Sequence, residues 1–235
     1  MSGHSKWSTI KHKKAILDAK RGSVFTKLAN GIAIAVKKGG SGDPEFNFSL
    51  RLAIEQARSA NMPNVNIKRA IERGLGKGEG GELLEFVLEG YGPGGVAIVI
   101  EVVTDNRNRI VAQVHTMLDK VGGSLAEPGS VLYLFSRVGR VMYAGQLSDE
   151  DSLEIIELGA SDWNQEAEGG IIWTELGRES GVAKYMTEHE YNDVEIAVVY
   201  SPSVNVDSGN KSREVENLLE QLEANDDVQG VYANN

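Results

Sequence analysis

The sequence predicts an α+β protein of several domains, in which a helical N-terminal domain is followed by two α/β sandwiches. Three observations carry this prediction. Apolar residues recur at helical spacing over the first 77 residues, and from residue 83 onward segments of strand and helix character alternate. Charge also divides the chain. Residues 1–78 hold 15 Lys+Arg and five Asp+Glu, and the remainder holds nine Lys+Arg and 29 Asp+Glu. The two sections therefore carry formal net charges of +10 and −20, which indicates modules with different partners.

Three short amphipathic helices are expected in the basic section. The first runs from Ser23 to Lys38 and ends at a Gly-Gly pair. The second begins after an Asp43-Pro44 N-cap. Its inner face is expected to carry Phe46, Leu50, Ile54 and Ala57. The third spans about Asn64 to Arg73 and is followed by a glycine-rich linker, residues 74–82.

Strands and helices alternate beyond this linker. Strands are expected at residues 83–89, 96–104, 131–135, 140–144, on both sides of a turn at 168–170, and at 194–200 and 228–232. Helices are expected from Asp105 or Asn106 to residue 122, and at 148–158, 178–189 and about 215–222. Helices between mostly antiparallel strands predict sandwiches with the helices on one face. There is material for two such domains, and one can interrupt the other.

Two glycine motifs resemble a dinucleotide-binding loop but lack its context. Such a loop follows a strand and opens a helix, because the helix N-terminus binds the pyrophosphate. The match at residues 76–81 follows a helix, and the match at 90–95 lies between two strands. The second match is therefore expected to be a glycine-proline hairpin loop.

Composition narrows the class of protein. The chain has 235 residues and 41% apolar composition, enough for a sizeable core. It has no cysteine, which excludes disulfides, thiolate metal sites and a cysteine nucleophile. No apolar run approaches a membrane span, and the N-terminus lacks a secretory signal. A cytoplasmic protein is expected. A mitochondrial transit peptide is the competing interpretation of the first 20 residues, although Trp7 and Asp18 are atypical of one.

The histidines give no catalytic or metal-binding pattern. His4, His12, His115 and His189 are too far apart for an H-E-x-x-H motif, and no P-loop or nucleophile elbow occurs. His115 lies beside the apolar face of its helix and is expected to be partly buried. The lysines that flank His4 and His12 would repel a metal cation. The sequence thus predicts a non-enzymatic protein without metal, cofactor or small-molecule substrate.

The basic section predicts a nucleic-acid interface. Lysine and arginine neutralise phosphates, and a tryptophan can stack on an unpaired base. Helices need charged outer faces in any case, but ordinary faces mix both signs, whereas here the ratio is fifteen to five. Arg58, Arg73 and Lys77 belong to the same surplus. The residues expected to contact nucleic acid are His4, Lys6, Trp7, Lys11, Lys13, Lys14, Lys20, Arg21, Lys27, Arg51, Lys68 and Arg69.

Arg107 and Arg109, in the stretch TDNRNR, are further candidates with two equal interpretations. In the first, Asp105 or Asn106 caps a helix and both arginines are solvated. In the second, the helix N-terminus and the two guanidinium groups bind phosphate together.

Seven ordered motifs carry a resemblance to a known family. They are GHSKW (3–7), RG before Phe-Thr-Lys-Leu (21–28), DPEFNFSLRLAI (43–54), NMPNVNIKRAI (61–71), EGYGPGGVA (89–97), TDNRNR (104–109) and GSVLYLF (129–135). Together they resemble the YebC/PmpR family, which includes the mitochondrial translational activators of cytochrome c oxidase.

The resemblance implies a domain plan. A basic helical domain would span residues 1–77, a discontinuous α/β domain residues 78–130 and 204–235, and an inserted α/β domain residues 131–203. Both α/β domains would be ferredoxin-like.

The resemblance also implies a regulator of gene expression. The partner would be promoter DNA for a DNA-binding transcriptional regulator, or ribosomal RNA or tRNA for a ribosome-associated factor that relieves stalling, for example at proline runs. Neither function involves a membrane. A pure protein-interaction scaffold is the third class, and it predicts that charge reversal of Lys11, Lys13 and Lys14 has no effect.

Overall fold

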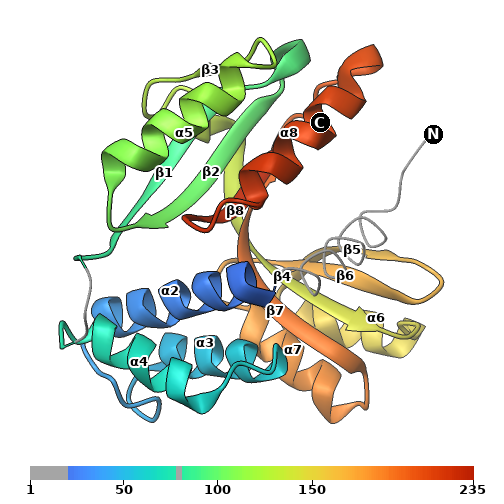
Figure 1. The fold of residues 1–235 in the computed structure, drawn as a ribbon. Coiled ribbons are helices and arrows are strands. Elements are labelled where there is room, and N and C mark those ends of the chain that lie inside the picture. Colours follow the sequence, from blue (N-terminus) through green and yellow to red (C-terminus); the bar gives the residue numbers. More distant parts are fainter. Residues whose placement is uncertain (1–20, 78–80) are drawn as a thin grey trace. The chain divides into compact units, whose positions relative to one another are not determined.

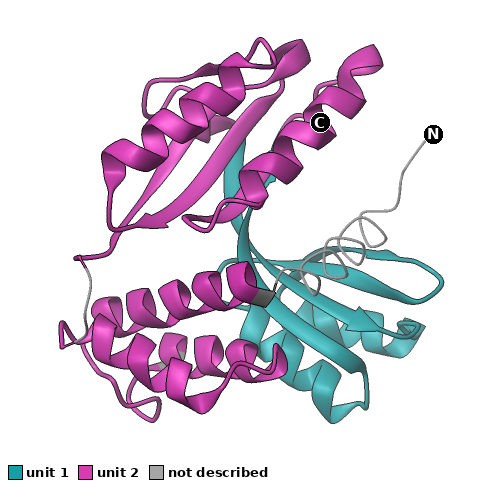
Figure 2. Ribbon diagram, in the orientation of Figure 1, with its two compact units in different colours: residues 1–16, 135–203 teal, residues 17–134, 204–235 magenta. Residues whose placement is uncertain are grey.

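The computed structural model describes residues 21–77 and 81–235 (Figure 1). Its described residues form two compact units, residues 21–134 with 204–235 and residues 135–203 (Figure 2). Across these residues there are seven α-helices and two four-stranded antiparallel sheets. This architecture confirms the predicted α+β class with a helical N-terminal part. The boundaries of the three domains stay a prediction.

Three helices form the N-terminal part of the larger unit. They are α2 (Arg21–Gly39), α3 (Phe48–Ser59) and α4 (Asn64–Gly74), as the apolar spacing predicts. Their apolar faces meet in one core. It contains Ile32, Val36, Leu50, Ile54, Ala57, Met62, Ile67 and Ala70.

The start of α3 corrects the sequence-based prediction. Asn47, not Asp43, is the N-cap: it is buried, its Oδ1 accepts the Leu50 N–H at 3.1 Å, and its Nδ2 donates to the carbonyls of Ala35 and Ser41. The helix therefore begins four residues later than expected. Phe46 precedes the helix and is 79% exposed, so its predicted place on the inner face is wrong.

The first sheet belongs to the same unit. Its strands are β1 (Leu84–Tyr91), β2 (Ala97–Thr104), β3 (Ser124–Leu125) and β8 (Val228–Ala233), in the order β3-β1-β2-β8. Helices α5 (Arg107–Asp119) and α8 (Ser212–Glu223) cover one face (Figure 1).

Between β1 and β2 the chain turns at η1 (Pro93–Gly95), where Gly94 and Gly95 have φ of 76° and 78°. The glycine-proline hairpin is thus confirmed.

A buried carboxylate, Glu89 of β1, ties the 126–134 loop to this sheet. Its oxygens accept the N–H groups of Gly129, Val131 and Leu132 at 2.5–2.7 Å. Burial by itself raises the pKa of Glu89, but the three backbone donors outweigh it and hold the pKa below its ordinary value. Because these N–H groups bind the carboxylate, the strand expected at 131–135 does not form. The chain makes the 3₁₀ turn η2 (Leu132–Leu134) instead.

The second unit, residues 135–203, contains the other sheet. Its strands are β4 (Phe135–Ala144), β5 (Ala160–Gln165), β6 (Gly169–Thr174) and β7 (Asn192–Pro202), in the order β5-β6-β4-β7. Helices α6 (Asp149–Glu157) and α7 (Glu179–Glu188) pack on one face. The unit begins and ends on paired strands, since Phe135 pairs with Pro202. The strand expected at 140–144 is the second half of β4.

Asp151 holds this second helical layer together. It accepts hydrogen bonds from the Ser148 hydroxyl at 2.5 Å and from the Tyr185 and Tyr191 hydroxyls at 2.7 Å. The Ser148 bond and then the two tyrosine bonds lower the pKa of Asp151. Ser148 also caps α6 by accepting the Asp151 N–H.

Within residues 21–77 and 81–235, no helix combines the length and the apolarity that a membrane span requires.

Candidate nucleic-acid interface

Half of the predicted interface lies outside the described residues. His4, Lys6, Trp7, Lys11, Lys13, Lys14 and Lys20 fall in the first twenty positions. Arg21 is the first residue of α2.

The outer face of α4 presents two of the predicted cations. Ile67 and Ala70 of this helix are buried against α2 and α3, whereas Lys68 and Arg69 are exposed. Val65, 58% exposed, lies one turn earlier on the same outward face. An exposed basic helix face with an apolar contact point suits a phosphate backbone.

Helix α3 adds exposed arginines to the same helical part. Arg51, a predicted contact, and Arg58, which the candidate set leaves out, are both exposed. Lys77 is exposed after α4. Phe46, in the turn before α3, is a largely exposed aromatic ring that helical periodicity misplaced. The sequence feature that could have placed Phe46 outside the helix is Asn47, the N-cap residue that directly follows it.

Lys27 is turned toward the protein and not toward solvent. It lies half-buried on α2, and its Nζ donates to the carbonyl oxygen of Glu223 at the end of α8, at 2.5 Å. Burial lowers the pKa of Lys27, and the nearby Glu223 and Asp226 act in the opposite direction. The ammonium group of Lys27 thus binds the C-terminal end of α8, near Glu223 and Asp226.

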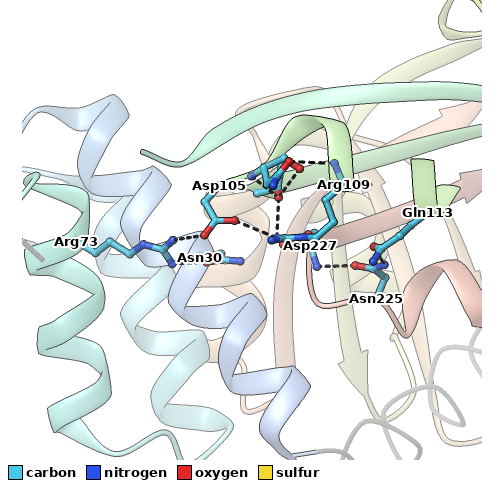
Figure 3. Close-up of polar contacts among 9 residues, drawn as sticks. Asn30, Arg73, Asp105, Arg109, Gln113, Asn225 and Asp227 are labelled. Carbon is cyan, nitrogen blue, oxygen red and sulfur yellow. Dashed lines mark hydrogen bonds and ion pairs between the residues drawn. The ribbon is translucent and has the colours of Figure 1, made fainter. Parts of the chain in front are cut away.

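At the start of α5, the geometry matches the capping interpretation. Asn106 is the N-cap and accepts the Arg109 N–H at 3.0 Å. Arg107 lies over the Phe86 ring, 4.9 Å from its centroid. The guanidinium of Arg109 binds Asp227 at 2.9 Å and Asp105 at 3.0 Å (Figure 3). The bonds to Asp227 and then Asp105 raise the pKa of Arg109. The cap of the first interpretation is therefore present, but Arg109 is ion-paired as well as partly exposed.

Arg73 extends this network from α4. Its guanidinium donates to the Asn30 amide oxygen at 3.3 Å and lies 3.8 Å from the Asp105 carboxylate (Figure 3). Together with Arg109, Gln113, Asn225 and Asp227 it lines a polar hollow of about 480 Å³. Among the described residues, two arginines and three aspartates line this hollow, so its cations are matched by acids. The network joins residues far apart in the chain, so residue spacing could not have revealed it.

The histidines of the described segments belong to no cluster of metal ligands. His115 is exposed and its Nδ1 lies 3.0 Å from the Asp119 carboxylate, one turn along α5. The prediction that it is partly buried is wrong, because Val114 and Leu118 occupy the inward positions. Among residues 21–77 and 81–235, no three His, Cys, Asp or Glu side chains gather as metal ligands.

Comparison with known proteins places the chain in a family. A model described as the TACO1/YebC protein N-terminal domain matches residues 5–77, and one described as the TACO1/YebC second and third domain matches residues 83–235. The chain belongs to the TACO1/YebC family. The match to the family's N-terminal domain thus includes Trp7 and the lysines around it.

Full-length relatives and a solved structure agree with this family. Proteins named "Probable transcriptional regulatory protein" from Halothermothrix orenii and Acidobacterium capsulatum are 46% and 44% identical over the whole of this chain, covering 94% and 96% of their own lengths. The crystal structure of a conserved hypothetical protein from Aquifex aeolicus has a TM-score of 0.87 and 41% identity. That match covers 98% of this chain and 96% of the other.

Proposed function

We propose that this protein is a non-enzymatic, nucleic-acid-binding regulator of gene expression, and that it acts as a DNA-binding transcriptional regulatory protein. The names of its curated relatives support a regulatory role. The observation that carries nucleic-acid binding is the surplus of cations in residues 1–78, several of them exposed on α3 and α4. A polyanion is the natural partner of such a surface.

The geometry sorts the predicted contacts into two groups. Lys68 and Arg69 are exposed and free to approach a phosphate backbone. Lys27 and Arg109 already bind groups within the protein. We therefore expect the nucleic acid to contact the outer faces of α3 and α4 and the N-terminal arm around Trp7, and not the start of α5.

Paired substitutions in the full-length protein test this assignment. Lys68→Gln with Arg69→Gln should weaken binding to a promoter duplex several-fold and reduce the slope of log affinity against log salt by about 2. Lys120→Gln with Lys211→Gln, which removes two exposed cations elsewhere, is the matched control and should change little. Equal losses in both pairs would show that only net charge matters.

Arg109→Met tests a predicted contact that the structure places in ion pairs, and it should leave nucleic-acid binding unchanged. Because Arg109 binds two carboxylates, its removal should leave nucleic-acid affinity within about twofold of the wild type. A loss as large as that of the α4 pair would contradict the sorting of these residues.

A ribosome-associated translation factor is the second candidate. The specific observation in its favour is the combination of a basic arm containing Trp7 with a body of net charge −20, which resists general adsorption to nucleic acid. Footprinting on promoters and co-sedimentation with ribosomes under stalling conditions distinguish the two. A protected promoter site supports the first function, and sedimentation with ribosomes that depends on Trp7 supports the second.

A further inference from the structure

The second unit has an exposed apolar surface that nucleic-acid binding does not use. On α6, Ile155 points into the core, whereas Leu153 is 67% and Ile156 46% exposed. Leu176, in the turn after β6, is 55% exposed. Single exposed apolar residues are ordinary, but a group of three large ones marks a contact surface.

The three side chains belong to one local surface. Leu153 and Ile156 are three residues apart on α6 and so share a face. The end of α6 is joined to the turn that carries Leu176, because Gly159 donates to the Ile156 carbonyl and accepts the Glu175 N–H. The end of α6 and this turn also line a hollow of about 280 Å³. Among the described residues that line it, Ile156 is the one large apolar side chain, and the others are Glu157, Gly159, Ala160, Ser161, Glu175 and Arg178.

The charge around this surface selects the partner. Glu150, Glu154, Glu157 and Glu175 are exposed beside it, and Arg178 is the one cation among the described residues that line the hollow. Residues 135–203 as a whole contain fourteen acids and four Lys+Arg. Such a surface repels phosphates, and a second copy of the same acidic unit would be repelled as well.

We propose that the outward face of α6 and the 175–178 turn form a docking site for a basic segment of another protein. An apolar side chain of that segment packs against Leu153 and Ile156, and its lysines or arginines pair with the surrounding glutamates. Apolar anchors within a charged rim are the usual anatomy of such interfaces. The site shares no residue with the proposed nucleic-acid surface, and it would let one molecule bind both a nucleic acid and a basic protein.

Two synthetic peptides of equal charge test the apolar part of the site. One is a lysine-rich 12-residue peptide with leucines, and the other has serine at each leucine. The full-length protein should bind the leucine peptide about tenfold more tightly by fluorescence anisotropy, which corresponds to one well-buried anchor. Leu153→Ser, Ile156→Ser and Leu176→Ser together should abolish this preference. Leu84→Ser with Val204→Ser, equally exposed in the other unit, should retain it.

Substitution of acids tests the charged rim. Glu150→Gln with Glu154→Gln should weaken both peptides several-fold at low salt. Glu216→Gln with Glu220→Gln has the same spacing on α8 and should weaken them clearly less. If the two pairs behave alike, or if wild-type protein binds both peptides equally, the docking site is refuted.

Site-specific photocrosslinking in cells identifies the occupant. A photoreactive residue at position 153 should crosslink to lysine- or arginine-rich segments of other proteins, whereas one at position 204 should not. Crosslinks to nucleic acid, to a second copy of this chain, or to the same partners from both positions would overturn the proposal.

Discussion

The two sheets have the same architecture, but the carboxylates that tie neighbouring segments to them have different hydrogen-bond donors. Each has four antiparallel strands and two helices on one face, and each unit contains a carboxylate with three donors. In the first unit, Glu89 is 4% exposed and its donors are backbone N–H groups. In the second, Asp151 is only partly buried and its donors are side-chain hydroxyls.

The difference in donors determines how much stability is lost when each carboxylate is replaced. Backbone donors cannot rotate away or be lost without moving the chain, so Glu89 fixes the path of a whole loop. Hydroxyl groups can turn to water when their acceptor is lost, so Asp151 aligns α6 with α7 at a lower cost.

The largest effect is expected at Glu89. Glu89→Gln places an amide N–H₂ against backbone donors and should lower the free energy of unfolding by about 3 kcal/mol. Urea unfolding measures the loss, and hydrogen exchange of the Gly129–Leu132 amides should accelerate with it. Glu85→Gln, which removes an exposed partner of Lys38 on the same strand, should cost less than about 1 kcal/mol. If both variants lost a similar free energy of unfolding, the backbone donors to Glu89 would not be a special constraint of the first sheet.

Asp151→Asn should have a smaller effect. The amide keeps one acceptor for a tyrosine hydroxyl, and the remaining hydroxyls can reach water, so we expect a loss of about 1 kcal/mol. Asp149→Asn, in the first turn of the same helix, is the control for the lost helix-dipole interaction. If Asp151→Asn proves as costly as Glu89→Gln, hydroxyl donors are as constraining as backbone ones.

Both carboxylates make stability depend on pH in the acid range. Their pKa values are lowered in the folded protein, so the stability they contribute is present above their unfolded pKa values. It is lost as pH falls through the folded values. The difference between wild type and Glu89→Gln should therefore shrink below about pH 4. A difference that stays constant down to pH 2 would show that Glu89 acts by shape alone.

The ion pairs of Arg109 should matter modestly and mainly at low salt. Arg109→Met removes its bonds to Asp105 and Asp227 and should lower the thermal midpoint slightly at low ionic strength, with a smaller drop at 1 M salt. Thermal unfolding at the two salt concentrations measures this dependence. A drop independent of salt would assign the effect to packing.

The smallest effect is expected on the loop that Glu89 holds. Tyr133 is 73% exposed, so Tyr133→Ser should change the free energy of unfolding by no more than about 0.5 kcal/mol. Val131→Ala, at a fully buried position in the same loop, should cost about 1–2 kcal/mol. Equal costs would show that this loop packs differently.

Local patterns were sufficient for most of the fold. Helical spacing and the glycine stops depend on neighbouring residues, and the structure confirms them. The errors arose where a distant group decided the outcome. Asn47 binds the carbonyl of Ala35 and moves the start of α3, and Glu89 binds the N–H groups that a strand at 131–135 would need.

The candidate interface shows the same limit. Charge counting identified the basic section, and the exposed Lys68 and Arg69 fit that prediction. It could not separate them from Lys27 and Arg109, because their partners Glu223 and Asp227 lie 196 and 118 residues away in the chain.

The pairing of Phe135 with Pro202 has a consequence for the order of folding. Strand β2 must find β8, with Val99 opposite Tyr232, across an interval that contains the whole second unit. Once β4 and β7 have paired, the two ends of that interval are held together, and the loop that β8 must close becomes much shorter. Because β8 follows β4 and β7 in the chain, the sheet of the second unit can form during synthesis before β8 completes the sheet of the first unit.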